Sequence, residues 1–211
     1  MRKLINNWQN ISAVLAVVTI FIAVSGQWDL TQRTLLLLNA FLLLHFFEEF
    51  GWPGGFPYMG MKVMMGNTEP DPGKWNVNNL SSMFGNWGFL LLVYIPSLFL
   101  TELKPLTIAV VLFSILEGAG HLLIFNIRMR SFYNPGMITA VFGMVPVAVY
   151  YLNSISGRHL YVWHDCLIGL AWCAAVFLFC FCSPLYWKLG AVKGYPLTHR
   201  SAFGMYKAGI D

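Results

Sequence analysis

Residues 34–50 read TLLLLNAFLLLHFFEEF, an apolar stretch that ends in a histidine and two adjacent glutamates, His45, Glu48 and Glu49. Its length approaches the ~20 residues that a helix needs to cross the hydrocarbon core of a bilayer. An ionised carboxylate near the middle of such a helix costs about 3 kcal/mol on insertion scales. The stretch therefore predicts a membrane-spanning helix whose charged end belongs to a polar site inside the protein.

The composition of the whole chain agrees with a membrane protein. Of the 211 residues, 57% are hydrophobic and 10% are charged, and the mean hydropathy is +0.62, whereas an average soluble domain is about 25% charged. We expect one all-α domain over residues 1–211, a polytopic helical bundle. The predicted spans are Ile11–Gly26, Thr34–Phe50, Met83–Thr101, Pro105–Asn126, Gly136–Asn153 and Val162–Cys182. The first is also typical of a signal peptide, because Arg2 and Lys3 precede an apolar run that ends in small residues.

The basic residues predict the orientation of these spans. One side of the six-span arrangement carries Arg2, Lys3, Lys62, Lys74, Arg128, Arg130, Lys188, Lys193, Arg200 and Lys207, and the other carries only Arg33, Lys104 and Arg158. Ten against three, out of 13 in all, predicts that both termini are cytoplasmic. The net charge of +4 then reflects membrane topology, and its dispersed lysines and arginines give no reason to expect nucleic-acid binding.

A second charged motif lies in the fourth predicted span, where residues 117–121 read EGAGH. Glu117 and His121 are one helical turn apart and share a face, as do His45 and Glu49. Both spans run toward the cytoplasm in the predicted topology, so the two motifs lie at similar depth. We expect His45, Glu48, Glu49, Glu117 and His121 to form one site, with Asn86 of the third span as an accessory amide.

Two kinds of chemistry fit these residues. Imidazoles and carboxylates on facing helices are typical ligands of iron, zinc and manganese, which predicts a divalent transition metal, iron or zinc, held by the five residues. Neighbouring carboxylates in apolar surroundings are also typical of an acid/base pair, with Glu48, Glu49 and Glu117 as catalytic groups. A third interpretation is that the acids and histidines only hold helices together. The residue pattern leaves all three open.

The same motif resembles a known family. His45-Phe46-Phe47-Glu48-Glu49 followed by Gly51-Trp52-Pro53, then His121 and the stretch Arg130-Ser131-Phe132-Tyr133-Asn134-Pro135-Gly136 leading into Thr139-Ala140 and Pro146, are similar to the HXXEE-motif family of small bacterial membrane proteins. The resemblance covers about Asn39 to Tyr150. It implies that His45, Glu48, Glu49 and His121 act together in a bacterial inner membrane, but it supplies no reaction. The position of Glu117 in the site is inferred from helical geometry alone. A looser likeness, in residue types only, is to the sterol isomerase (emopamil-binding) family.

These observations favour a membrane enzyme, metal-dependent, that acts on a small hydrophobic substrate taken from the lipid bilayer. The alternatives are a metal-free acid/base isomerase or cyclase and, ranked lower, a proton-coupled transporter. The connection Gly51 to Ser82 is long, is bracketed by glycines and prolines, and is predicted to be a cytoplasmic or interfacial loop that covers the site. Its apolar residues Phe56, Tyr58, Met61 and Met64 are expected at the mouth of the cavity.

Overall fold

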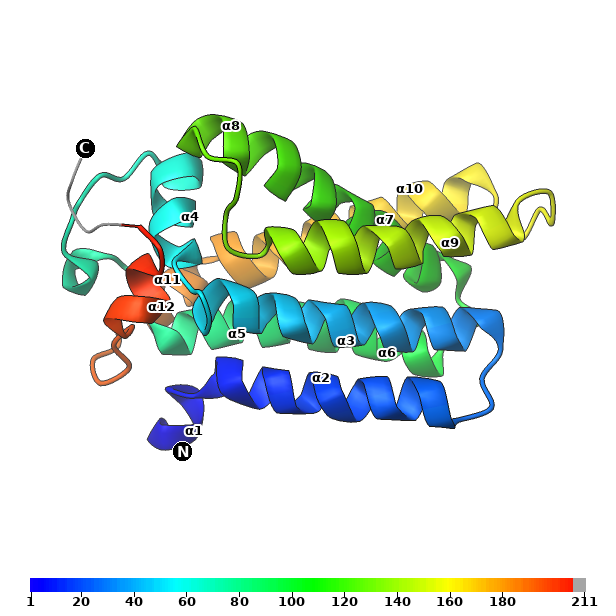
Figure 1. Cartoon of the computed structure of the whole chain (residues 1–211), viewed down its shortest axis with the longest axis horizontal. Coiled ribbons are helices and arrows are strands. Elements are labelled where there is room, and N and C mark those ends of the chain that lie inside the picture. The colour runs from blue at the N-terminus through cyan, green and yellow to red at the C-terminus, as the bar shows by residue number, and fades with distance from the viewer. Residues whose placement is uncertain (207–211) are drawn as a thin grey trace.

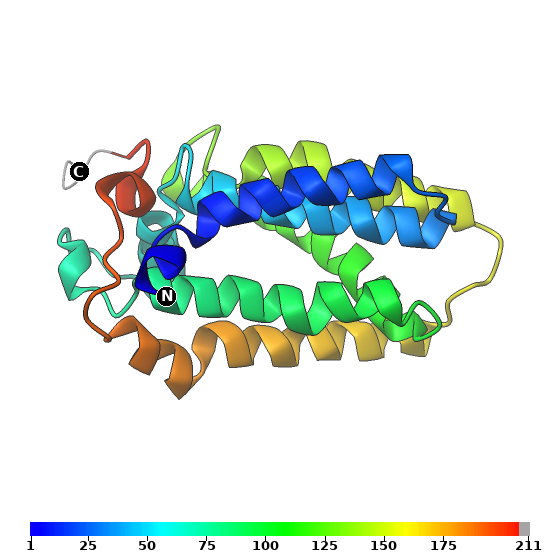
Figure 2. The ribbon, with the colours of Figure 1, turned by 90° about the horizontal axis from the view of Figure 1, so that it is seen from below.

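The computed structural model describes residues 1–206, so that Lys207, one of the ten basic residues on the predicted cytoplasmic side, lies outside the described residues. Every regular element in this part of the chain is a helix. The longest ones lie side by side as an elongated bundle, with α7 running obliquely to the rest (Figures 1 and 2). The bounds are α1 Arg2–Ile5, α2 Trp8–Ser25, α3 Leu30–Phe50, α4 Phe56–Met65, η1 Pro72–Lys74, α5 Asn79–Phe89, η2 Leu90–Tyr94, α6 Ile95–Phe99, α7 Lys104–Ala119, η3 Gly120–Phe125, α8 Asn126–Met129, η4 Thr139–Met144, α9 Val145–Ile155, α10 Trp163–Phe177, η5 Leu178–Cys182, α11 Pro184–Gly190 and α12 His199–Phe203.

Five helical segments are long and apolar enough to cross a membrane, and they correspond to five of the six predicted spans. They are Trp8–Ser25, Leu30–Phe50, Asn79–Phe99, Lys104–Met129 and Trp163–Gly190. The remaining prediction, Gly136–Asn153, corresponds to a shorter apolar helix, Thr139–Ile155. The apolar helices indicate an integral membrane protein.

Local signals explain where two of these helices begin. Asp29 and Gln32 form a capping box at the start of α3, so this helix begins before the predicted Thr34. Asn78 caps α5 in the same way, and its amide also donates to the carbonyls of Leu189, Gly190 and Val192 near the end of α11. The cap of α5 therefore fixes the third span against the last one.

The prolines inside two of the spans follow widened helical turns. Pro96 is the second residue after the π-helical segment η2, and Pro146 is the second residue after the π-helical segment η4. A proline lacks the backbone N–H and its ring crowds the carbonyl four residues earlier, so a wider turn relieves both problems without ending the helix. A third π-helical segment, η3, begins at Gly120 and contains His121.

The connection between α3 and α5 contains structure that the sequence analysis described only as a loop. Its helix α4 has Gly66 as the C-cap. Helix α4 packs against α12 from the C-terminal part of the chain. The backbone N–H of Gly55 donates to the carbonyl of Ser201 at 3.2 Å. A cluster of Met61, Trp75, Val77, Tyr186, Ala202 and Phe203 joins this connection to α11 and α12. Helix α4 is thus held at the end of the bundle where α8 and α12 also lie (Figure 1).

Candidate functional site

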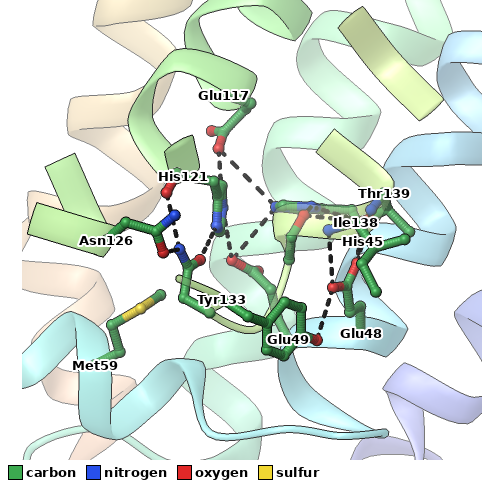
Figure 3. A network of polar contacts seen from close by, with 12 residues as sticks. His45, Glu48, Glu49, Met59, Glu117, His121, Asn126, Tyr133, Ile138 and Thr139 are labelled. Carbon is green, nitrogen blue, oxygen red and sulfur yellow. Dashed lines mark hydrogen bonds and ion pairs between the residues drawn. The ribbon is translucent and has the colours of Figure 1, made fainter. Parts of the chain in front are cut away.

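Four of the predicted site residues meet between α3 and the α7–η3 helix. The Nε2 atom of His45 lies 3.3 Å from Glu49 Oε1 and 3.9 Å from Glu117 Oε2. The Nε2 atom of His121 lies 3.6 Å from each of the same two carboxylate oxygens. Figure 3 shows this closed ring of contacts, in which each imidazole faces both carboxylates. The structure therefore brings these four predicted residues together.

The outer nitrogen of His45 is fixed by a loop, Tyr133–Thr139, which we call the positioning loop. His45 Nδ1 lies 3.0 Å from the carbonyl oxygen of Gly136 and 3.0 Å from the hydroxyl oxygen of Thr139. A carbonyl oxygen can only accept a hydrogen bond, so Nδ1 carries the proton and donates it. With Nδ1 fixed as the donor, Nε2 is the nitrogen that faces the carboxylates.

The outer nitrogen of His121 is fixed by the same loop. His121 Nδ1 donates to Asn134 Oδ1 at 2.5 Å, and the amide group of Asn134 donates to the carbonyl of His121 and to Asn126 Oδ1. These two donor bonds define which end of the Asn134 amide is the oxygen. The Nε2 atom of His121 is fully buried and has no hydrogen-bond partner among the described residues. It too faces the carboxylates.

Gly136 lets the positioning loop approach both rings. Its φ is +98°, a conformation that residues with a side chain rarely adopt. A Cβ atom at this position would lie 2.5 Å from Cε1 of His121 and 2.7 Å from Cε1 of His45. Both the backbone angle and the space therefore require glycine here.

Glu48 is placed apart from the ring of four, although it was predicted to be a ligand and a catalytic group. Its Oε1 accepts from the Tyr133 hydroxyl at 3.0 Å and the Ile138 N–H at 3.1 Å. Its Oε2 accepts from the Thr139 N–H at 2.8 Å and the Thr139 hydroxyl at 2.6 Å. The carboxylate thus lies at the start of the helix Thr139–Ile155, where free N–H groups favour a negative charge. Burial, with the nearby Glu48 charge, raises the pKa of Tyr133 above its usual value, so the phenol stays protonated and donates.

Three residues of the ring form a cluster that could hold a metal ion. Two Nε2 lone pairs and two carboxylate oxygens are all hydrogen-bond acceptors when deprotonated, so either a cation or shared protons must lie between them. Their separations of 3.3–3.9 Å exceed the 2.7–3.2 Å of ordinary N–H···O hydrogen bonds. With ligand bonds of about 2.0–2.1 Å in tetrahedral geometry, neighbouring ligand atoms lie roughly 3.3–3.5 Å apart. The ligand atoms of His45, Glu117 and His121 lie within 4.8 Å of one another, and this cluster could hold a metal ion.

A cavity of about 300 Å³ opens beside the ring. His45, Glu49 and Glu117 line it, and the side chain of Glu117 is 24% exposed whereas those of the other three ring residues are almost fully buried. Asn86, predicted as an accessory, is a lining residue as well. Most of the wall is apolar and includes eight phenylalanines.

Helix α4 covers one side of this cavity. Phe56, Met61 and Met64 line it, as expected from the sequence. Tyr58 is not a lining residue, and that expectation is wrong. Its ring contacts Trp75, Phe203 and Tyr206 instead. One face of α4 therefore lines the cavity, and another face contacts the C-terminal part of the chain.

Sequence reasoning missed the residues of the positioning loop. Asn134, Gly136 and Thr139 belong to a stretch that was noted only for its family resemblance. A polar residue followed by proline and glycine indicates a turn, but no local pattern tells which histidine such a turn contacts. The contacts of this loop with His45 and His121 form only when α3 and the α7–η3 helix are packed together.

Comparison with known proteins identifies the family and no function. The family model described as "Protein of unknown function with HXXEE motif" matches residues 36–151, which is more than half of the chain. The chain therefore belongs to the HXXEE-motif family. No match was found among curated proteins or among solved structures.

Proposed function

We propose that this member of the HXXEE-motif family is a metal-dependent membrane enzyme that acts on a hydrophobic substrate. The observation that carries the proposal is the ring of two imidazole Nε2 atoms and two carboxylate oxygens, whose lone pairs converge at 3.3–3.9 Å. Backbone and amide acceptors fix the protons on the outer nitrogens, as they do for metal-binding histidines in general. The adjoining cavity is apolar enough to admit a hydrophobic molecule.

His45 and His121, together with Glu117, Glu49 or both, would hold the ion. Two histidines with one or two carboxylates suit iron(II) or zinc. Such an ion, when bound, polarises an oxygen of the substrate or lowers the pKa of a bound water. The more exposed carboxylate, Glu117, faces the cavity and is suited to accept or return a proton at the substrate.

Glu48 has a supporting role in this proposal. Its four hydrogen bonds hold the start of the helix Thr139–Ile155, and Thr139 in turn contacts His45 Nδ1. The carboxylate therefore orients a ligand through the positioning loop and does not itself touch the ion. This role differs from the ligand role predicted from the sequence.

The membrane arrangement that accompanies the proposal has six spans, with both termini in the cytoplasm of a bacterial cell and the site in the cytoplasmic half of the inner membrane. The starts of the first long helix and α12 lie at the same end of the bundle (Figure 1), which supports an even number of crossings. Lysines and arginines are in excess at the end of the bundle where the site lies, which supports a cytoplasmic orientation of that end. A substrate from the bilayer would enter from the inner leaflet, beside α4.

The metal content of the purified protein tests the proposal. We expect near-stoichiometric iron or zinc by elemental analysis of protein purified without chelators, or after reconstitution with the ion. The Glu102→Gln variant changes an exposed glutamate that precedes the start of α7, whereas Glu117 lies near the end of that helix, and it should retain the metal. Absence of metal from folded wild-type protein after reconstitution would overturn the metal-dependent function.

A metal-free acid/base isomerase or cyclase is the second candidate. One observation favours it: Glu49 and Glu117 both line the cavity, so one can donate a proton while the other accepts one. A folded, metal-free protein that turns over a hydrophobic substrate would support this second function over the first. Chelator treatment of such a protein would leave its rate unchanged.

A further inference from the structure

Three buried helical hydroxyls, those of Ser82, Thr107 and Ser201, have no hydrogen-bond partner among the described residues, and of these three Ser82 alone lines the cavity. Five other helical side chains donate to the carbonyl four residues earlier, at 2.7–2.9 Å: Ser12, Thr19, Ser25, Ser114 and Ser154. Such back-bonding is the usual way for a serine to satisfy its hydroxyl inside a helix. The hydroxyl of Ser82 on α5 is buried and has no hydrogen-bond partner among the described residues.

The carbonyl that Ser82 would use already has other donors. Asn78 O accepts from the backbone N–H of Ser82 at 2.9 Å and from the hydroxyl of Ser81 at 3.2 Å. A buried hydroxyl without a partner costs about 1–3 kcal/mol, so its retention calls for an explanation. Ser82 is 2% exposed and lines the cavity, which places the unsatisfied hydroxyl beside the space where a ligand would lie.

Asn86, one turn further along α5, lines the same cavity. Its amide nitrogen donates to the carbonyl of Ser82 at 2.9 Å, and this bond holds the side chain of Asn86 next to Ser82. The two residues belong to α5, whereas the imidazoles and carboxylates of the ring belong to α3 and the α7–η3 helix. The cavity therefore has two polar places on different helices, and its wall is otherwise mainly apolar.

We propose that Ser82 and Asn86 form a subsite that binds a neutral hydrogen-bonding group, a hydroxyl or a carbonyl, of an otherwise apolar substrate. A hydroxyl and a primary amide can each donate and accept, so together they recognise such a group. No lysine or arginine is among the described residues that line the cavity, and two carboxylates are. A phosphate or carboxylate bound at Ser82 and Asn86 would thus have no lysine or arginine among the lining residues to neutralise it. The subsite rests on the proposed function only in treating this cavity as the place where substrate binds.

Photolabelling with a matched pair of probes tests the subsite. The probes are two alkyl diazirines of equal length, one ending in a hydroxyl and one in a methyl group, applied to the full protein in lipid nanodiscs at equal membrane concentration. Mass spectrometry then measures labelling of the cavity-lining peptides. We expect the hydroxyl probe to label them about fivefold more than the methyl probe, as one neutral hydrogen bond allows, and this ratio to fall near one in Ser82→Ala.

The control variant is Ser154→Ala, which removes a hydroxyl that back-bonds outside the cavity and should leave the ratio unchanged. A ratio of one in the wild type, or a ratio that persists in Ser82→Ala, would overturn the subsite. The metal content separates this outcome from failure of the proposed function. A hydroxyl preference in protein that binds no metal leaves the subsite standing and removes only the metal-dependent reaction.

Thermal stability gives a second measurement. Ser82→Ala removes an unsatisfied hydroxyl and should leave the unfolding temperature of the ligand-free protein unchanged or higher. Ser114→Ala removes a buried hydroxyl bonded to Val110 O and should lower it. An equal loss in both variants would mean that the Ser82 hydroxyl has a structural partner, and the subsite would then be rejected.

Discussion

The two sides of the imidazole pair differ in how completely their polar groups are bonded. On the side of the positioning loop, both Nδ1 atoms, the amide of Asn134 and the carboxylate of Glu48 all have partners. On the side of the cavity, His121 Nε2 and the Ser82 hydroxyl have none among the described residues. A buried polar group is normally satisfied. The loop side is therefore fully bonded within the protein, and the unbonded groups on the cavity side are those to which the proposed function assigns a ligand.

Glu48 and Glu49 show the same difference at neighbouring positions. Glu48 accepts four hydrogen bonds from Tyr133, Ile138 and Thr139. Within residues 1–206, the polar contacts of the Glu49 carboxylate are with the two imidazoles, at 3.3 and 3.6 Å, which is longer than ordinary hydrogen bonds. Both carboxylates are buried. That of Glu48 is bonded to the positioning loop, whereas that of Glu49 faces the two imidazoles.

The largest effect is expected from changes on the cavity side. Glu49→Gln and His121→Ala should each abolish metal retention and function, because each removes a ligand atom from the ring. The bundle should stay assembled, since its packing is mostly apolar. Elemental analysis and circular dichroism measure the two properties. The double variant should be strongly non-additive, and additive losses, or unfolding alone, would contradict a shared site.

A somewhat smaller effect is expected from Gly136→Ala, which tests whether the loop sets the position of both rings. The new Cβ would contact the two imidazoles and force the strained backbone angle to change. Metal affinity should fall by about 100-fold, the upper range for residues that orient ligands. Gly66→Ala is the matched control, because φ is +62° there and nothing lies within 4 Å of the added atom. Equal effects of the two variants on metal affinity would argue against this role of Gly136.

Glu48→Gln tests whether Glu48 contributes mainly to stability and Glu49 mainly to metal binding. The amide nitrogen would meet N–H and O–H donors, so we expect the free energy of unfolding to fall by about 2 kcal/mol. Metal should still bind, although more weakly. Glu49→Gln should show the reverse pattern, with metal lost and stability of the metal-free protein kept. Thermal unfolding with and without the ion compares them, and identical behaviour of the two variants would remove the distinction.

The smallest of these effects is expected from Asn134→Ala. The ring of His121 would lose the acceptor that fixes its proton on Nδ1, and metal affinity should fall by about tenfold. Nitrogen-15 NMR of His121 should then show a mixture of tautomers. Asn153→Ala, at an exposed position of α9, serves as the control. A single unchanged tautomer in Asn134→Ala would show that other contacts orient the ring.

Sequence reasoning located four of the ring residues because helical periodicity and span direction suffice for that purpose. His45 and Glu49 are four residues apart, as are Glu117 and His121, and each pair shares a helix face. The same periodicity also placed Glu48 within this face. Its actual partners lie 85–91 residues further along the chain. Spacing along a helix gives the direction of a side chain only approximately. The hydrogen bonds of the positioning loop hold the Glu48 carboxylate away from the two imidazoles, and these bonds form only in the folded chain.

The connection from Gly51 to Ser82 shows a different limit. Its glycines and prolines favoured a loop, yet residues Phe56–Met65 form α4. This helix packs on α12, more than 130 residues later, and that contact favours a helix over the local pattern. Its apolar residues indicated a cover for the cavity, and Phe56, Met61 and Met64 line it as expected. No local sequence pattern distinguishes these three residues from Tyr58, whose ring contacts the C-terminal residues Phe203 and Tyr206.

Helix α4 can pack against α12 only after the ribosome has translated α12, which comes late in the chain. The four ring residues and the positioning loop have all been translated once the ribosome has passed Thr139, whereas α12 begins only at His199. Translation of the intervening residues takes on the order of ten seconds or less. Until it is complete, α4 lacks the partner that holds it over the cavity. In the proposed metal-dependent enzyme, this interval would let an ion reach the nascent site before α12 holds α4 in place.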